Sequence, residues 1–238
     1  ISYFEHGGAW YRKRPKRGAP SKTFHKTHYF LDDKTTATEK SHYYFRFDPV
    51  KWILIHTKEG ETLAVTEKIL DVHYYASGKN EELKYKSGKA SNQNEYENSY
   101  VRSWLNNTNF PGMYYQYGNG LGMLDSDLYL NSSEREILKT HCFGDKFFLL
   151  SKEEGEQYLT IEERKASLTD FAICYRELEP DYKGVWGTRS KGKGSKKIIV
   201  FSKDGEALEW GSDHEFFGRF AVKLNQEKLQ ALQKAKTR

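Results

Sequence analysis

Strand-like hydrophobic patterns occupy two parts of the chain, separated by a stretch with helical signals. Residues 43–55 are aromatic and β-branched, and residues 62–70 repeat that character after the turn residues Glu59-Gly60-Glu61. This arrangement predicts a β-hairpin, in which Pro49 marks a break or an edge position.

A second group of strands is predicted further along the chain. Residues 198–201 read Ile-Ile-Val-Phe, and the Asp204-Gly205 pair that follows is typical of a hairpin turn into a strand over 207–210. Residues 216–224 read as one final strand. Residues 225–238 are polar and compatible with a short helix or a tail.

Between these regions, capping residues predict short helices. The apolar stripe of residues 100–105 follows Asn98 and Ser99, either of which can cap a helix there. A hydroxyl residue with a glutamate three positions later predicts a capping box at three places: Ser133 with Glu136, Ser151 with Glu154, and Thr160 with Glu163. The first box is expected to open a helix through Leu138. Residues 146–150 are predicted to form a short buried strand, and Thr169 to cap a last short helix.

These elements predict an α+β domain over residues 43–224. Its first hairpin and last strands are expected to share an antiparallel sheet, with short flanking helices and long loops. Residues 1–42 show no sustained period, so they are predicted to form an irregular segment that packs on the domain.

Composition supports a folded chain. Of 238 residues, 37% are hydrophobic and 15% aromatic, whereas disordered segments are poor in aromatic residues. No apolar run approaches the ~20 residues of a membrane-spanning helix, so no membrane span is predicted.

Positive charge is concentrated in two places. Lys and Arg total 38 and Asp and Glu 33, which gives a net charge of +5. The excess lies in residues 12–17 and 183–203, close in sequence to several tryptophans. Because bases stack on such rings, a weakly basic nucleic-acid-binding protein is one alternative. Glutamates within residues 153–163 offset much of this charge, and no nucleic-acid-binding module is recognised.

Several ordered segments resemble a bacterial family of unknown function. They are residues 47–54, 67–71, 96–106, 148–154, 169–172, 186–190 and 219–222, which are similar in order to the family's P-I-K-W-R-V-L, E/D-K-I-L-D, W-E-N-S-x-L-R-x-W-L-N, F-L-L-S-x-E-E, T-D-Y-A, W-W-L-R-S and V-R-P-A-L. The resemblance implies a fold of the C-type-lectin-like or formylglycine-generating-enzyme-like type, without an established reaction. Two departures stand out: Lys191-Gly192-Lys193-Gly194 replaces the usual Pro-Gly, and Phe220 replaces a proline. The rim of the expected ligand face is therefore basic.

The sequence offers weak support for catalysis. Formylglycine-generating relatives use a reactive cysteine pair, but Cys174 has no Arg or His beside it to depress its pKa. Cys142 and Cys174 are interpreted as buried thiols, with one disulfide between them as the alternative. Histidines are scattered, and the acidic turn residues lack the calcium-binding pattern of lectins. We therefore predict no catalytic residue, no metal site and no cofactor.

Aromatic and charged residues near the second basic stretch form the predicted ligand site. Aromatic faces supply stacking area and Arg supplies directional donors, as sugar- and protein-binding surfaces require. The predicted ligand-binding residues are Trp186, Arg189, Lys191, Lys193, Asp204, Trp210, Asp213 and His214. For Trp186 and Arg189, packing in the core is the competing interpretation.

The sequence thus favours a non-catalytic recognition module that binds a glycan or protein partner. A bacterial cell-surface, secreted or phage-related setting is expected, although the sequence shows no leader. An enzyme of the formylglycine-generating type and a nucleic-acid-binding protein are the alternatives.

Overall fold

The computed structural model describes residues 2–6, 9–14, 43–46, 50–76, 94–106, 132–169, 172 and 184–236. Its strands are β1 (Ser2–His6), β2 (Ala9–Arg14), β3 (Tyr43–Arg46), β4 (Trp52–Lys58), β5 (Glu61–Thr66), β6 (Asp71–Tyr74), β7 (Leu138–Lys139), β8 (Phe147–Phe148), β9 (Trp186–Lys191), β10 (Lys197–Phe201), β11 (Ala207–Gly211), β12 (Glu215–Gly218) and β13 (Ala221–Asn225). Its helices are η1 (Tyr96–Asn98), α2 (Tyr100–Leu105), α3 (Ser132–Glu136), η3 (Cys142–Gly144), α4 (Lys152–Tyr158), α5 (Ile161–Arg164) and α7 (Gln226–Lys236).

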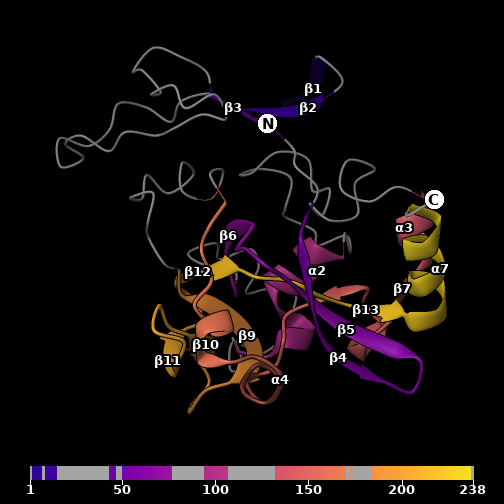
Figure 1. The fold of residues 1–238 in the computed structure, drawn as a ribbon. Helices are drawn as coiled ribbons and strands as arrows, with labels where there is room; N and C mark the ends of the chain where they lie inside the picture. The colour runs from indigo at the N-terminus through magenta and orange to yellow at the C-terminus, as the bar shows by residue number, and fades with distance from the viewer. Residues whose placement is uncertain are drawn as a thin grey trace.

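The first large sheet has the strand order β4-β5-β13-β7, and β8 also pairs with β13 (Figure 1). All its pairings are antiparallel. Glu59 and Gly60 form the β4–β5 turn with φ of 53° and 75°, the left-handed conformation that a tight hairpin requires. The predicted hairpin is confirmed over residues 52–66, and β5 pairs with β13, the last strand of the described chain. Two parts of the prediction are wrong. Residues 43–46 pair with β2 instead, and the strands over 197–201 and 207–211 belong to a separate sheet.

The second large sheet has the order β11-β10-β9-β12-β6. Its pairings are antiparallel except for one parallel bridge between β12 and β9. Neither large sheet closes into a barrel within the described part of the chain. The fold is therefore α+β, as predicted.

A third sheet of three strands, in the order β1-β2-β3, is formed by the first part of the chain. The prediction that residues 1–42 are irregular is wrong for β1 and β2, which pair antiparallel from Ser2 with Lys13 to His6 with Ala9. Aromatic residues on either side of Gly7-Gly8 were the available signal, because a Gly-Gly pair favours a two-residue hairpin turn. The domain boundary near residue 43 stays a prediction.

The helix caps predicted for α2, α4 and α5 are confirmed. Ser99 Oγ accepts a hydrogen bond from the Arg102 N–H, and both residues of each capping box bond reciprocally at Ser151–Glu154 and Thr160–Glu163. The first predicted box is wrong, because α3 begins at Ser132 and already contains both Ser133 and Glu136. The helix is also shorter than expected, since Leu138 belongs to β7. The end of the described chain forms the 11-residue helix α7.

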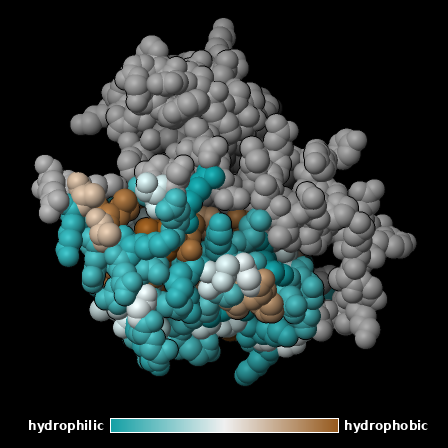
Figure 2. All heavy atoms as spheres, turned by 90° about the vertical axis from the view of Figure 1, so that its right-hand side faces the viewer, coloured by the Kyte–Doolittle hydropathy of each residue, from teal (hydrophilic) through white to brown (hydrophobic). Residues whose placement is uncertain are grey.

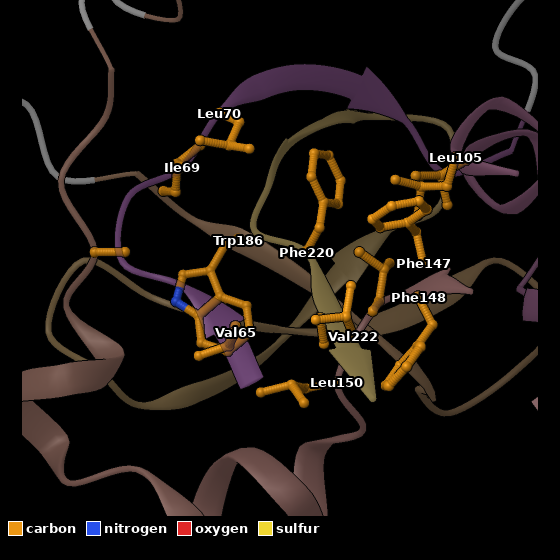
Figure 3. Close-up of a cluster of buried hydrophobic side chains, with 14 of the residues drawn as sticks. Val65, Ile69, Leu70, Leu105, Phe147, Phe148, Leu150, Trp186, Phe220 and Val222 are labelled. Atoms are coloured by element: carbon orange, nitrogen blue, oxygen red, sulfur yellow. The ribbon is translucent and has the colours of Figure 1, made fainter. Parts of the chain in front are cut away.

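The prediction of one final strand over 216–224 is wrong, because the chain changes sheets there. β12 ends at Gly218 in the second sheet, and β13 begins at Ala221 in the first. A Cβ on Gly218 would lie 2.2 Å from the Phe220 ring, so only glycine permits this close crossing. Side chains of the crossing and of both sheets meet in one buried cluster that includes Trp186, Phe220 and Val222 (Figure 3).

Arg219 is the charged residue at the crossing, and it is buried with its side chain 1% exposed. Its Nε donates to the Thr66 carbonyl at 2.8 Å and its Nη1 to the Glu163 carbonyl at 2.5 Å. The guanidinium lies 5.1 Å from the Trp186 ring centroid, a cation–π distance. Burial lowers the pKa of Arg219 to about 10, so the side chain stays charged at neutral pH.

In Figure 2, the side that carries β4, β5 and α7 is mostly hydrophilic, with a few small hydrophobic patches. The part of the chain that the structure describes contains no helix long and apolar enough to cross a membrane.

We expect Arg219→Met to lower the free energy of unfolding by about 2–4 kcal/mol, because two buried carbonyls lose their donors. Urea unfolding at neutral pH measures this change. Lys203→Met, at an exposed turn position, is the matched control and should change stability by less than about 0.5 kcal/mol. A loss for Arg219→Met no larger than that of the control would contradict the role assigned to the buried guanidinium.

Candidate functional site

Trp186 lies in the core rather than on a ligand-binding surface. Its side chain is fully buried, its Nε1 donates to the Arg164 carbonyl at 2.7 Å, and its ring centroid lies 4.6 Å from that of Phe201. The structure therefore favours the packing interpretation of this residue over contact with a ligand.

Arg189 is also occupied by partners within the chain. Its Nη1 and Nη2 donate to Glu154 Oε2 and Oε1, both at 2.6 Å, and Nη1 also donates to the Leu149 carbonyl at 2.7 Å. This bidentate pair joins β9 to the first turn of α4. Burial opposes ionisation of Glu154, but the Arg189 guanidinium outweighs it and holds the pKa of this carboxyl below its usual range. Arg189 and Glu154 thus stabilise the fold.

His141 and Cys142 lie beside this ion pair. His141 Nε2 is buried without a hydrogen-bond partner, 3.9 Å from Glu154 Oε1, and its ring lies 4.2 Å from that of Phe148. Burial, aided by the Arg189 charge, lowers the pKa of His141 to about 4. The imidazole is therefore neutral at physiological pH.

Cys142 is a free thiol, so the alternative of a disulfide with Cys174 is not realised. Burial raises the pKa of Cys142, which favours the thiol over the reactive thiolate. Cys174 itself lies outside the described residues.

Five of the other predicted site residues gather at one end of the second sheet. We call this region the loop end. It comprises the β9–β10 hairpin with Lys191 and Lys193, the end of β11 with Trp210, and the turn after β11 with Asp213 and His214. The two loops are tied together because the Ser212 N–H donates to the Lys196 carbonyl at 2.9 Å. The Asn94 side chain also holds the hairpin, since its Nδ2 donates to the Gly194 and Lys197 carbonyls at 2.7 and 2.9 Å.

Aromatic and charged groups are mixed at the loop end. The His214 ring lies 5.9 Å from that of Trp210 in an edge arrangement, and His214 Nδ1 lies 3.6 Å from Asp213 Oδ1. The side chains of His214 and Asp213 are 66% and 60% exposed. Lys191 Nζ forms an ion pair with Glu95 at 3.1 Å.

Asp204 is not part of this arrangement. It lies in the β10–β11 turn, at the opposite end of the same strands, where its N–H donates to Ser202 Oγ at 3.1 Å. The adjacent Gly205 has φ of 82° and packs against the Ile161 carbonyl, so the turn is fixed against α5.

Lys196 and Lys197 belong to the loop end but were not among the predicted site residues. Together with Lys193 they are exposed, and the described residues place no carboxylate within ion-pair distance of these three ammonium groups. The Lys-rich run itself was the signal. Over the same described ranges, no three His, Cys, Asp or Glu side chains are placed to hold a metal ion.

Fold and site together define a class: an α+β domain with two mostly antiparallel large sheets and a lysine-rich loop end. Residues 59–224 match the family described as Domain of unknown function (DUF6273). Since this match covers well over half of the chain, the chain belongs to that family. No significant match was found among curated proteins or among solved structures.

The lowered pKa of His141 predicts a specific pH dependence of stability. Between the ordinary histidine pKa near 6.5 and about 4, the unfolded chain binds a proton that the folded chain excludes, so stability falls as the pH decreases. When the pH falls from 7.5 to 5, the free energy of unfolding should decrease by about 2 kcal/mol less in His141→Phe than in the unmodified chain. Urea unfolding at the two pH values measures it. Replacement of the exposed His214 by Gln is the control, and an equal effect of the two substitutions would refute the prediction.

Proposed function

We propose that this chain is a non-catalytic recognition module whose loop end binds an acidic ligand, carried by a glycan or by a protein. The single observation that supports this most is the exposed trio Lys193, Lys196 and Lys197, whose ammonium groups have no carboxylate within ion-pair distance in the described part of the chain. The rings of Trp210 and His214 lie in the same region and add surface for stacking.

A C-type-lectin-like fold is part of the proposal. Pairing of an early hairpin strand, β5, with the last strand, β13, supports it, together with the short helices between them. Such folds commonly carry function on loops that a rigid sheet positions, which is where the lysine trio lies.

The enzyme alternative receives less support. Arg189 and Glu154 are hydrogen-bonded to one another, and the raised pKa of Cys142 disfavours its thiolate. The nucleic-acid alternative receives less support because the sequence contains no recognised nucleic-acid-binding module. Glu209 Oε1 accepts a hydrogen bond from the Lys193 N–H at 2.7 Å, and this carboxylate contact with the hairpin backbone supports the choice of an acidic ligand.

Neutralising the trio in K193Q/K196Q/K197Q should weaken binding to heparin and to poly-glutamate by roughly tenfold or more, because the favourable charge contacts are lost. Surface plasmon resonance at several salt concentrations measures the affinity, with neutral dextran as a non-binding reference. K68Q/K146Q/K203Q is the matched control, since it removes the same charge from exposed positions elsewhere.

Equal losses in the two triple variants would show that only net charge matters and would overturn the proposal. Binding to a single-stranded oligonucleotide with a steep salt dependence, and to neither acidic probe, would favour the nucleic-acid alternative instead.

A further inference from the structure

Within the described part of the chain, β11 forms an outer edge of the second sheet and has β10 as its only neighbour in the strand order (Figure 1). Its pairing with β10 runs without a bulge from Lys197 opposite Gly211 to Phe201 opposite Ala207. The edge is therefore regular over the whole strand.

Hydrogen bonds that flank this strand show which of its backbone groups point outward. The Ser202 N–H donates to the Glu206 carbonyl at one end, and the Ser212 N–H donates to the Lys196 carbonyl at the other. Since inward and outward residues alternate in an antiparallel pair, Leu208 and Trp210 bond to β10, while Ala207 and Glu209 direct their N–H and C=O groups outward. The described residues supply no partner for those outward groups.

The side chains along the edge suit a further strand. Leu208 is 45% exposed although it stands opposite the fully buried Val200, and Trp210 follows on the same face opposite Ile198. Natural edge strands are usually protected by bulges, prolines or inward charges. The β4 edge has such a bulge at Ile55, whereas β11 has a regular register and contains no proline.

We propose that the β11 edge binds an extended segment of a partner protein, which adds to the second sheet as another strand. Its backbone bonds to Ala207 and Glu209, and apolar side chains at alternate positions pack on Leu208 and Trp210. The partner segment also carries an acidic residue, which lies at the Gly211 end of β11, next to Lys196 and Lys197. Only this acidic residue rests on the proposed function; the strand addition stands on the edge geometry.

The test uses the full chain to select from a displayed library of short random peptides. We expect enriched peptides to alternate apolar and polar residues, with an acid near one end. The best peptide is then synthesised, and its affinity is measured by fluorescence anisotropy. Glu209→Pro removes the outward N–H at a position where an edge strand tolerates proline, and should weaken binding roughly tenfold or more. Glu209→Gln keeps that N–H and should bind within about twofold of the unmodified chain.

Two further measurements keep the test decisive. Leu208→Lys, at an exposed position, should also weaken the peptide, so the result does not depend on the proline variant alone; circular dichroism checks that both variants fold. Two N-methylated peptides complete the test, one modified at its odd-numbered residues and the other at its even-numbered residues. Only one of the two should lose binding, because only alternate N–H groups of the peptide face β11.

Absence of enriched peptides, unchanged affinity in Glu209→Pro, or equal effects of the two methylation patterns would each overturn the inference. These outcomes are separable from a failure of the proposed function. If Leu208→Lys loses peptide binding but retains the heparin binding that the lysine triple variant loses, the loop end binds acidic ligands independently of the edge. If the triple variant affects neither heparin nor poly-glutamate while Glu209→Pro abolishes peptide binding, the strand addition stands and the proposed acidic ligand fails.

Discussion

The buried guanidinium of Arg219 is the interaction on which the arrangement of the two large sheets depends. It donates to the end of β5 at Thr66 and to α5 at Glu163, and it lies over Trp186 of β9. Both hydrogen-bond acceptors are neutral carbonyls, and the charges of the Glu163 and Glu67 carboxylates also favour the ionised guanidinium. A lysine offers one compact donor group, whereas the planar guanidinium can reach two carbonyls and stack at once. The chain crosses between the two large sheets at Arg219, and the adjacent Gly218 and Phe220 are tightly packed against each other there.

Local signals allowed much of the fold to be predicted, and long-range contacts account for what was missed. The β4–β5 hairpin and the caps at Ser99, Ser151 and Thr160 depend on residues close in sequence, and all were predictable. The break between β12 and β13 was not, because residues 216–224 form a nearly continuous apolar stretch and Gly218 gives only a weak local signal. Which sheet each half joins depends on Arg219 finding partners more than fifty residues away in sequence, such as Thr66 and Glu163.

The candidate site was predictable in part for the same reason. Residues in polar turns, including Lys193, Asp213 and His214, are exposed as their surroundings suggested. Trp186 and Arg189 were predicted site residues for which core packing was the competing interpretation, because a tryptophan has the same local signature in a core as on a surface. The partner of Arg189, Glu154, lies 35 positions earlier and was recognised only as a capping residue. The β9–β10 hairpin and the turn after β11 lie together because of the register in which β9, β10 and β11 pair. No local sequence pattern specifies that register.

The position of β13 has a consequence for how the chain folds during synthesis. This strand lies between β5 and β7, yet it is among the last elements in chain order. During synthesis, one side of β5 therefore remains unpaired until residues 221–225 have emerged from the ribosome. The part of the core that contains Phe220 and Val222 cannot form before then. Folding of this kind, governed by contacts far apart in sequence, is slow, and it leaves an apolar strand exposed to other chains meanwhile. Production of this protein should accordingly be sensitive to translation rate and to the availability of chaperones that hold exposed strands.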